Sequence, residues 1–266
     1  MALEFLKAEA NGNDFLLVDA AAVAAERRGA LARALCDRHR GIGADGVEFV
    51  TWSGGPREAA FDLVLYNADG GEGEISGNGS RCAIAWAAER HGWSEMRVGT
   101  AAGEKHARVL GREGPTWRVE MAMGTPGAAR EHEIEVGGGR LKLTALSMGN
   151  PQCCVLVEEF PADWERLGAA LERHPLFPRR TNVEFVRVAG RHAIEIRIFE
   201  RGVGVTQSSG TGSCAAAVTA ILAGRADSPL RVAAPGGEQE VEWAGGGAQV
   251  HLRGPARIIA SGTIRD

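Results

Sequence analysis

The chain has 266 residues, of which 44% are hydrophobic and 24% charged, and its formal net charge is −4. This length is sufficient for one large or two medium domains, and the slightly acidic balance argues against nucleic acid as a ligand. No apolar run is long enough to span a membrane, and the first residues lack the pattern of a signal peptide. We therefore expect a cytoplasmic protein without a membrane partner.

The cysteines and histidines do not form a metal-binding pattern. The five cysteines are odd in number and show no CxxC spacing, and the seven histidines include no HxxxH pair. The three lysines do not lie beside a phosphate-binding glycine loop, which argues against a P-loop and against a lysine that carries a cofactor. The pattern predicts reduced cysteines, no metal site and a reaction that needs no cofactor.

In the first half of the chain, short apolar runs bounded by glycine predict strands, and two longer segments predict helices. The loops 41–46 and 67–73 are rich in glycine, and residues 123–127 are the candidate linker. Strands are expected at 5–8, 15–18, 46–52, 61–66, 96–99, 106–110 and 117–122, and helices at 21–38 and 80–90.

The second half repeats this plan. In residues 193–199, isoleucines alternate with charged residues, which is typical of a half-buried strand. The pattern favours an α+β fold in which each half is a curled, mostly antiparallel sheet around a central helix. Strands are expected at 132–136, 141–147, 153–157, 182–188, 193–199, 230–233, 239–243 and 248–252, and helices at 164–173 and 213–226.

One short motif occurs twice. The first signature, Ser76–Ser80, reads Ser-Gly-Asn-Gly-Ser, and the second signature, Ser209–Ser213, reads Ser-Gly-Thr-Gly-Ser. They lie 133 residues apart, half the length of the chain, which is the spacing that duplication of a domain leaves. Each precedes a predicted helix, and the free N–H groups at a helix N-terminus bind anions. Two similar anion sites are therefore expected, facing each other across a cleft.

Two such helix ends can bind a carboxylate and stabilise the carbanion that forms when a proton leaves the neighbouring carbon. A serine on each side would then suit a two-base racemase or epimerase, in which one residue removes the α-hydrogen and the other returns a proton. The alternative interpretation is that both serines are turn or N-cap residues. The repetition at half the chain length favours the catalytic interpretation.

A family resemblance covers nearly the whole chain. The sequence resembles diaminopimelate epimerases, which interconvert LL- and meso-diaminopimelate without pyridoxal phosphate. The joint order and spacing of several blocks carry the resemblance, although each block is weak alone. These blocks are Gly12–Phe15, Gly41–Asp45, Asn67–Gly70, Gly77–Cys82, Ser147–Pro151, Thr181–Phe185, Glu200–Gly202 and Gly210–Gly212.

The resemblance implies a fold, a ligand and roles for matched positions. It implies two pseudo-symmetric halves, 1–122 and 123–255, with a last strand at about 256–266 that returns to the first half, and it implies a homodimer. The ligand would be a diaminopimelate-like amino acid, with Glu200 on its reacting ammonium. Its distal end would be bound by Asn13, Asn67, Asn150, Asn182 and Arg201, and its reacting carboxylate by the backbone at Gly77, Asn78, Gly210 and Thr211.

The departures from the family concern the chemistry itself. The family's two acid/base cysteines align with Ser76 and Ser209. A histidine after Asn-Pro is replaced by Gln152, a substrate-side glutamine by Gly46, and a glutamate by Val205. Cys82 and Cys214 lie six and five residues beyond the serines, more than one helical turn away, so we do not expect them to substitute.

Three functions remain open from the residues alone. The first is an epimerase that uses Ser76 and Ser209 as its acid/base residues, either natural or engineered in place of cysteine. The second is an isomerase or racemase for another small acid, since phenazine-type isomerases resemble this fold and work without the cysteine pair. The third is an amino-acid-binding homologue with weak catalysis. We favour the first, because the predicted substrate-binding residues are retained.

Overall fold

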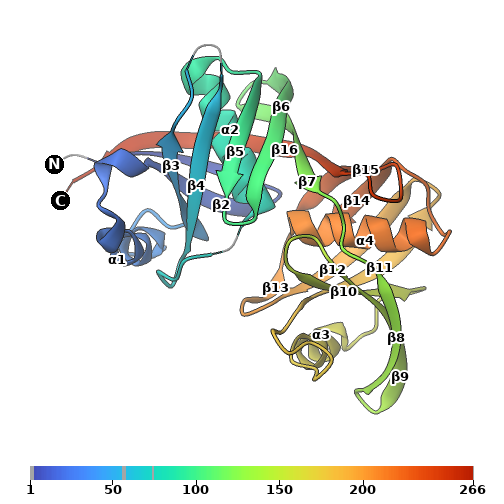
Figure 1. Ribbon diagram of the computed structural model, residues 1–266. Coiled ribbons are helices and arrows are strands. Elements are labelled where there is room, and N and C mark those ends of the chain that lie inside the picture. Colours follow the sequence, from blue (N-terminus) through green and yellow to red (C-terminus); the bar gives the residue numbers. More distant parts are fainter. Residues whose placement is uncertain (1–2, 56–57, 74, 266) are drawn as a thin grey trace. The chain divides into compact units, whose positions relative to one another are not determined.

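The computed structural model describes residues 3–55, 58–73 and 75–265. The chain forms two compact units, Met1–Met121 with Gly254–Asp266 and Ala122–Arg253. Their boundaries fall within the strands β7 and β16 (Figure 1). Residue 74 beside the first signature and residue 266 at the end of the expected returning strand lie outside the described residues. The predicted α+β class is confirmed, with extensive strand pairing and four α-helices in the described part of the chain.

In the first unit, a sheet closes on itself like a barrel. The long strand β16 (Val250–Ile264) hydrogen-bonds to β1 and to β7 and so joins the two ends of the sheet. The pairs β2–β3 and β4–β5 are parallel. The antiparallel pairs are β1–β2, β3–β4, β5–β6, β6–β7 and β1–β16. The strand order is β1 (Leu3–Ala10), β2 (Asn13–Asp19), β3 (Gly46–Trp52), β4 (Ala60–Asn67), β5 (Glu95–Thr100), β6 (Gly103–Glu113) and β7 (Thr116–Gly124).

The helix α2 (Gly77–His91) is the centre of this unit. It packs against β1, β2, β3 and β6, and 11 of its 15 residues are buried. Alanine, glycine and serine dominate its buried positions, and these small side chains allow strands to approach the helix closely. By contrast, α1 (Ala25–Cys36) packs on β3 and β4 and buries Ala32, Leu35 and Cys36.

The second unit repeats the plan. Helix α4 (Gly210–Leu222) packs against β9, β10, β11, β12, β14 and β15, and its first eleven residues are buried. The helix α3 (Trp164–Glu172) packs on β8, β11 and β12. The strands in spatial order are β15 (Gly237–Trp243), β14 (Leu230–Ala234), β12 (Ala193–Glu200), β11 (Asn182–Gly190), β10 (Pro151–Val157), β9 (Gly139–Ser147) and β8 (Arg130–Val136), and β13 (Gly204–Thr206) pairs with β12.

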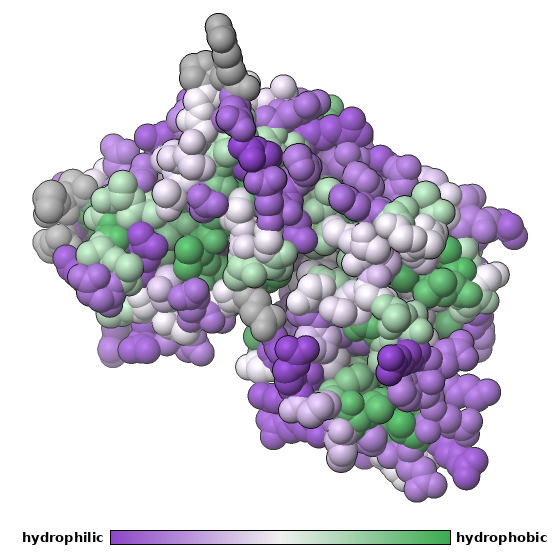
Figure 2. Space-filling view, viewed as in Figure 1, coloured by the Kyte–Doolittle hydropathy of each residue, from purple (hydrophilic) through white to green (hydrophobic). Residues whose placement is uncertain are grey.

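Alternating strand patterns explain how the apolar residues are buried. In β12, the isoleucines 194, 196 and 198 are all less than 2% exposed, as their alternation predicts. Few large apolar side chains remain exposed in the described residues, and they are scattered. Figure 2 shows apolar areas interspersed with hydrophilic side chains on the face that it presents.

Several element boundaries differ from the expectation. Both central helices begin at the second residue of their signature, three residues earlier than predicted, because the signature glycines are themselves helical. The helix predicted at 21–38 starts only at Ala25, after a short 3₁₀ turn (Ala20–Ala22) that Asp19 caps. Strand β7 extends into the expected linker as far as Gly124, and β16 is one continuous strand across Pro255 where two segments were expected.

Candidate active site

The two signature serines occupy the same position in their units. Ser76 is the N-cap of α2, and its Oγ accepts a hydrogen bond of 3.0 Å from the backbone N–H of Gly79. Ser209 is the N-cap of α4, and its Oγ accepts 3.2 Å from the N–H of Gly212. Both backbones are extended at the serine, as N-caps require. The capping role is therefore real, and it also holds each hydroxyl oxygen at the positive end of a buried helix, where an anion is stabilised.

In the first unit, the structure brings Asn13 and Asn78 together. The Asn78 Nδ2 donates to Asn13 Oδ1 at 3.3 Å, and Asn13 Nδ2 donates to Asp45 Oδ2 at 2.6 Å. Asp45 also binds Arg38, so a charged network fixes the Asn13 amide. Asn67 lies apart from these contacts: it is exposed at the end of β4 and is the strand partner of Gly46.

In the second unit, a hydrogen-bond chain leads to Ser209. Gln152 Nε2 donates to Asn150 Oδ1 at 2.6 Å, and Asn150 Nδ2 donates to Thr211 Oγ1 at 3.5 Å. The Thr211 Oγ1 lies 3.5 Å from Ser209 Oγ. Gln152, which replaces the family's histidine, is fully buried and holds the Asn150 amide through this hydrogen bond.

The predicted pair Glu200 and Arg201 lies at the end of β12, where it is joined to Asn182. Asn182 Oδ1 accepts 2.9 Å from the backbone N–H of Arg201, and Arg201 Nη1 donates to Arg179 O at 3.3 Å. Glu200 is half-buried and pairs with Gly204 of β13. Asn182 therefore supports the backbone of the Glu200–Gly202 turn in this structure.

Glu172, which the sequence analysis did not identify, binds the same turn. Glu172, whose side chain is 2% exposed, accepts 3.0 Å from the N–H of Gly202 and also binds Arg173 and Arg180. The hydrogen bonds from Arg180 and Gly202 hold the pKa of Glu172 below its ordinary value, although burial acts in the opposite direction and is the largest single influence. The only sequence signal was an acidic residue at the end of an amphipathic helix.

The substitution Glu172→Gln is expected to loosen this turn. It removes a charge-assisted hydrogen bond to Gly202, so the free energy of unfolding should fall by roughly 1 to 3 kcal/mol, and the KM should rise with a smaller change in kcat. Because the folded pKa is lowered, the wild-type contribution is present above the ordinary pKa of 4.5 and is lost as the pH falls through the folded value. Urea titration and steady-state kinetics measure both effects. Arg173→Gln, which alters an exposed partner of the same carboxylate, should have little effect, and an equal effect would contradict this role.

Two buried glutamates were also missed, one beneath each signature. Glu48 of β3 is 1% exposed and Glu184 of β11 is 0% exposed. Their sequence signal is a second internal repeat, since residues 47–50 and 183–186 both read Val-Glu-Phe-Val. A Cβ on Gly79 would lie 2.1 Å from Glu48 Oε1, and a Cβ on Gly212 would lie 2.7 Å from Glu184 Oε1. The fourth position of each signature is therefore glycine because a carboxyl group occupies the space beside it.

Burial raises the pKa of both Glu48 and Glu184 from the ordinary 4.5 to about 8. Between pH 4.5 and about 8, both carboxyl groups therefore stay protonated in the folded protein, whereas they are ionised in the unfolded chain. The stabilising contribution is complete below pH 4.5 and is lost as the pH rises towards 8.

The melting temperature is therefore expected to be lower at pH 9 than at pH 6, at constant ionic strength. The double variant Glu48→Gln/Glu184→Gln should lose most of this difference, because an amide does not titrate. Calorimetry at the two pH values measures it. An unchanged pH dependence in the double variant would show that other groups cause it.

Local contacts also explain one of the remaining departures from the family pattern, Gly46. A Cβ on Gly46 would lie 2.9 Å from Tyr66 O and 3.2 Å from a Leu65 methyl group, so a side chain there needs the neighbouring strand to move. Val205 lies in β13 and is 48% exposed. Cys82 and Cys214 are fully buried, and burial holds the pKa of the Cys82 thiol far above its ordinary value, which makes it a poor base.

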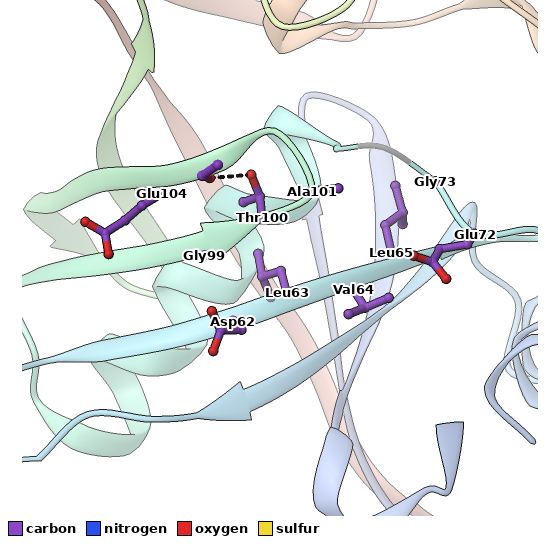
Figure 3. Close-up of a pocket in the computed structure, with 11 residues that line it drawn as sticks. Asp62, Leu63, Val64, Leu65, Glu72, Gly73, Gly99, Thr100, Ala101 and Glu104 are labelled. Carbon is purple, nitrogen blue, oxygen red and sulfur yellow. Dashed lines mark hydrogen bonds between the residues drawn. The ribbon is translucent and has the colours of Figure 1, made fainter. Parts of the chain in front are cut away.

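A pocket of about 340 Å³ opens in the first unit where β4 diverges from β5 (Figure 3). It contains none of the predicted site residues. Leu63 and Leu65 line it, and Asp62, Glu72 and Glu104 make it acidic. We do not assign the reaction to this pocket, because the signature serines do not line it. Among the described residues, no group of His, Cys, Asp and Glu side chains is arranged to hold a metal ion, and no helix is long and apolar enough to cross a membrane.

Comparison with known proteins decides the family. The sequence profile described as diaminopimelate epimerase matches residues 5–128 and 144–259. The chain belongs to the diaminopimelate epimerase family. It is 36% identical to diaminopimelate epimerase 1 of Nostoc sp., covering 99% of this chain and 100% of that protein, and 37% identical to the diaminopimelate epimerase of Pseudomonas fluorescens, covering all of both. This member of the diaminopimelate epimerase family is therefore an isomerase of the epimerase type.

Solved structures show the same fold with more distant sequences. A hydroxyproline epimerase from Agrobacterium vitis, with bound trans-4-hydroxy-L-proline, has a TM-score of 0.72 and 17% identity, covering 99% of this chain and 91% of that one. A phenazine biosynthesis protein of the PhzF family from Bacillus anthracis has a TM-score of 0.74 and 15% identity, covering all of both chains. At these identities, the likeness shows the fold alone.

Proposed function

We propose that the protein interconverts LL- and meso-diaminopimelate by a two-base reaction, in which one serine-based site removes the α-proton and the other supplies a new one. The observation that carries this proposal is the duplicated geometry, in which Ser76 and Ser209 each cap a buried helix whose N-terminus can bind a carboxylate. The membership of the family and the relatives named diaminopimelate epimerase support the choice of substrate.

The mechanism requires Ser76 and Ser209 to act on one α-carbon from opposite faces. One serine oxygen takes the α-hydrogen while the other returns a proton, and the N–H groups of α2 and α4 stabilise the charge that develops on the substrate carboxylate. In this proposal, Glu200 binds the reacting ammonium, and Arg201 with the amides of Asn13, Asn67, Asn150 and Asn182 binds the distal end.

The chemical difficulty is the low acidity of serine. A thiol has a reference pKa of about 8.5, and a serine hydroxyl is roughly five units less acidic, which corresponds to about 7 kcal/mol for forming the anion. A reaction that must first form a free serinate should therefore be several orders of magnitude slower than one that uses a thiolate. A working serine needs a neighbouring group that accepts its proton.

A substrate panel tests the proposed function. Purified protein is incubated with LL-diaminopimelate, L-proline or trans-4-hydroxy-L-proline, and the stereoisomers are separated by chiral chromatography. Formation of meso-diaminopimelate, with no inversion of the cyclic amino acids, is the expected result. Inversion of a cyclic amino acid alone would replace diaminopimelate as the substrate, and that alternative is motivated by the fold shared with the hydroxyproline epimerase.

A further inference from the structure

The two buried glutamates stand in the same relation to the two serines. Each is the third residue of its strand, β3 or β11, and each of these strands pairs in parallel with the strand on one side and antiparallel with the strand on the other. The carboxyl oxygen of each lies against the fourth residue of a signature, Gly79 or Gly212. The Val-Glu-Phe-Val repeat and the signature repeat therefore form one duplicated structural element.

The serine and the carboxyl group converge on the same glycine. Glu184 Oε1 and Ser209 Oγ lie 2.7 Å and 3.2 Å from the point where a Cβ on Gly212 would be. In the first unit, Glu48 Oε1 lies 2.1 Å from the corresponding point on Gly79, whose N–H donates 3.0 Å to Ser76 Oγ. In each unit, the serine hydroxyl and the buried carboxyl group therefore lie against the same signature glycine.

A structural role does not account for the Glu184 carboxyl group. Glu184 Oε1 is buried and has no hydrogen-bond partner among the described residues, although Cys154 Sγ donates to Oε2 at 3.5 Å. Burying an incompletely satisfied acid costs free energy that an apolar residue would not cost. Buried acids with displaced pKa values that lie beside a site are typical of proton-transfer groups.

We propose that Glu48 and Glu184 are positioning residues that hold the proton for Ser76 and Ser209, respectively. This inference rests on the proposed function. As a serine oxygen forms a bond to the α-hydrogen, its own O–H bond breaks and the hydrogen passes to the carboxylate behind it, and the C–H electron pair stays on the α-carbon. On the other face, the second serine gives its hydrogen to the α-carbon and regains one from a protonated carboxyl group. One carboxylate and one carboxylic acid exchange roles in each turnover, so no serinate is ever free.

Burial raises the pKa of Glu48, and the charge of Glu48 acts in turn on the Cys82 thiol of α2. Arg81, Glu9 and Asp14 act electrostatically on the same thiol. Glu184 lies beside Cys154 and Cys153 of β10, faces α4, and is affected by the charge of Glu200. With both acids poised near pH 8, the epimerisation rate should pass through a maximum near that pH and fall on either side.

Isotope exchange of each stereoisomer separately tests the inference. Loss of the α-hydrogen of LL- and of meso-diaminopimelate in D₂O is followed by NMR for the wild type, Glu48→Gln and Glu184→Gln. Each variant should lose exchange from one stereoisomer by about 100-fold or more and keep the other, with opposite preferences in the two variants. A role in packing alone would lower both stereoisomers together. Glu120→Gln, at a buried glutamate paired with Arg108, is the matched control and should change neither.

A cysteine background gives a second, independent measurement. In Ser76→Cys/Ser209→Cys, the thiols ionise without help, so adding Glu48→Gln or Glu184→Gln should change the exchange rate by less than about tenfold. If a glutamine variant does not fold, as judged by its melting curve, Glu48→Asp or Glu184→Asp replaces it and should keep a rate maximum in the pH profile.

The outcomes separate the two claims. Wild-type protein that exchanges neither stereoisomer overturns the proposed function and this inference with it. If the wild type exchanges and both glutamine variants keep this exchange, or lose it equally for both stereoisomers, the inference is overturned and the proposed function stands. The inference is supported if Glu48→Gln and Glu184→Gln lose α-hydrogen exchange from opposite stereoisomers in the protein with serines, and if these losses are absent from the protein with cysteines.

Discussion

Replacing either Ser76 or Ser209 with alanine is expected to lower the rate of diaminopimelate epimerisation by at least about 1,000-fold. Removing the hydroxyl deletes the only atom of that side chain that can carry a proton, and inversion needs a proton donor or acceptor on both faces of the α-carbon. Each alanine variant should also lose about 1 kcal/mol of stability, because the serine oxygens cap α2 and α4.

Two further variants separate catalysis from capping. Glycine at position 76 or 209 is a tolerated N-cap, so Ser76→Gly should restore much of the stability without restoring activity. Ser80→Ala and Ser213→Ala change buried serines one turn further into the helices and should keep most of the activity. Chiral chromatography and melting curves give both quantities. More than a tenth of wild-type activity in Ser76→Ala or Ser209→Ala would rule out the serine as an essential base.

The largest expected loss of stability comes from Arg81, which is fully buried in α2. Its guanidinium donates to Asn11 Oδ1 at 2.8 Å and to Asn78 Oδ1 at 2.7 Å. It also donates to Gly77 O at 3.3 Å and to Pro255 O at 3.2 Å. One side chain therefore joins the β1–β2 turn, the first signature and β16.

Arg81→Leu should lower the free energy of unfolding by about 3 to 5 kcal/mol, because several acceptors lose a buried charged donor together. For a chain of this size, that corresponds to a fall in melting temperature of roughly 10 °C. Arg118→Leu, at an exposed arginine of the same unit, should change stability by no more than about 0.5 kcal/mol. A similar loss in the two variants would mean that the Arg81 contacts contribute little.

Much of this fold is visible in the sequence because local patterns specify it. Alternating isoleucines predict β12, and the Ser-Gly-x-Gly-Ser repeat predicts two equivalent helix starts. Local patterns do not predict strand boundaries that depend on pairing with strands distant in the sequence. Strand β16 runs unbroken across Pro255 because it pairs with β15 at one end and β1 at the other, and β13 exists only as a three-residue partner of β12.

The candidate site was predicted unevenly for the same reason. The serines, Asn78 and Thr211 are adjacent in sequence to the helix starts, so a motif finds them. Glu48 and Glu184 are distant from the signatures in sequence and reach them only through the packing of β3 and β11 against the central helices. The Val-Glu-Phe-Val repeat was the available signal, and its meaning depends on burial that a single sequence does not reveal.

The most direct test of a two-base epimerase is deuterium incorporation during turnover. LL-diaminopimelate is converted by the wild-type protein in D₂O, and the meso product is examined by mass spectrometry and NMR at early times. We expect one deuterium at the inverted α-carbon of every product molecule, with little deuterium in the remaining substrate, because the base that removes hydrogen differs from the acid that delivers deuterium. Product without deuterium, or substrate and product labelled equally from the start, would contradict two separate serine sites.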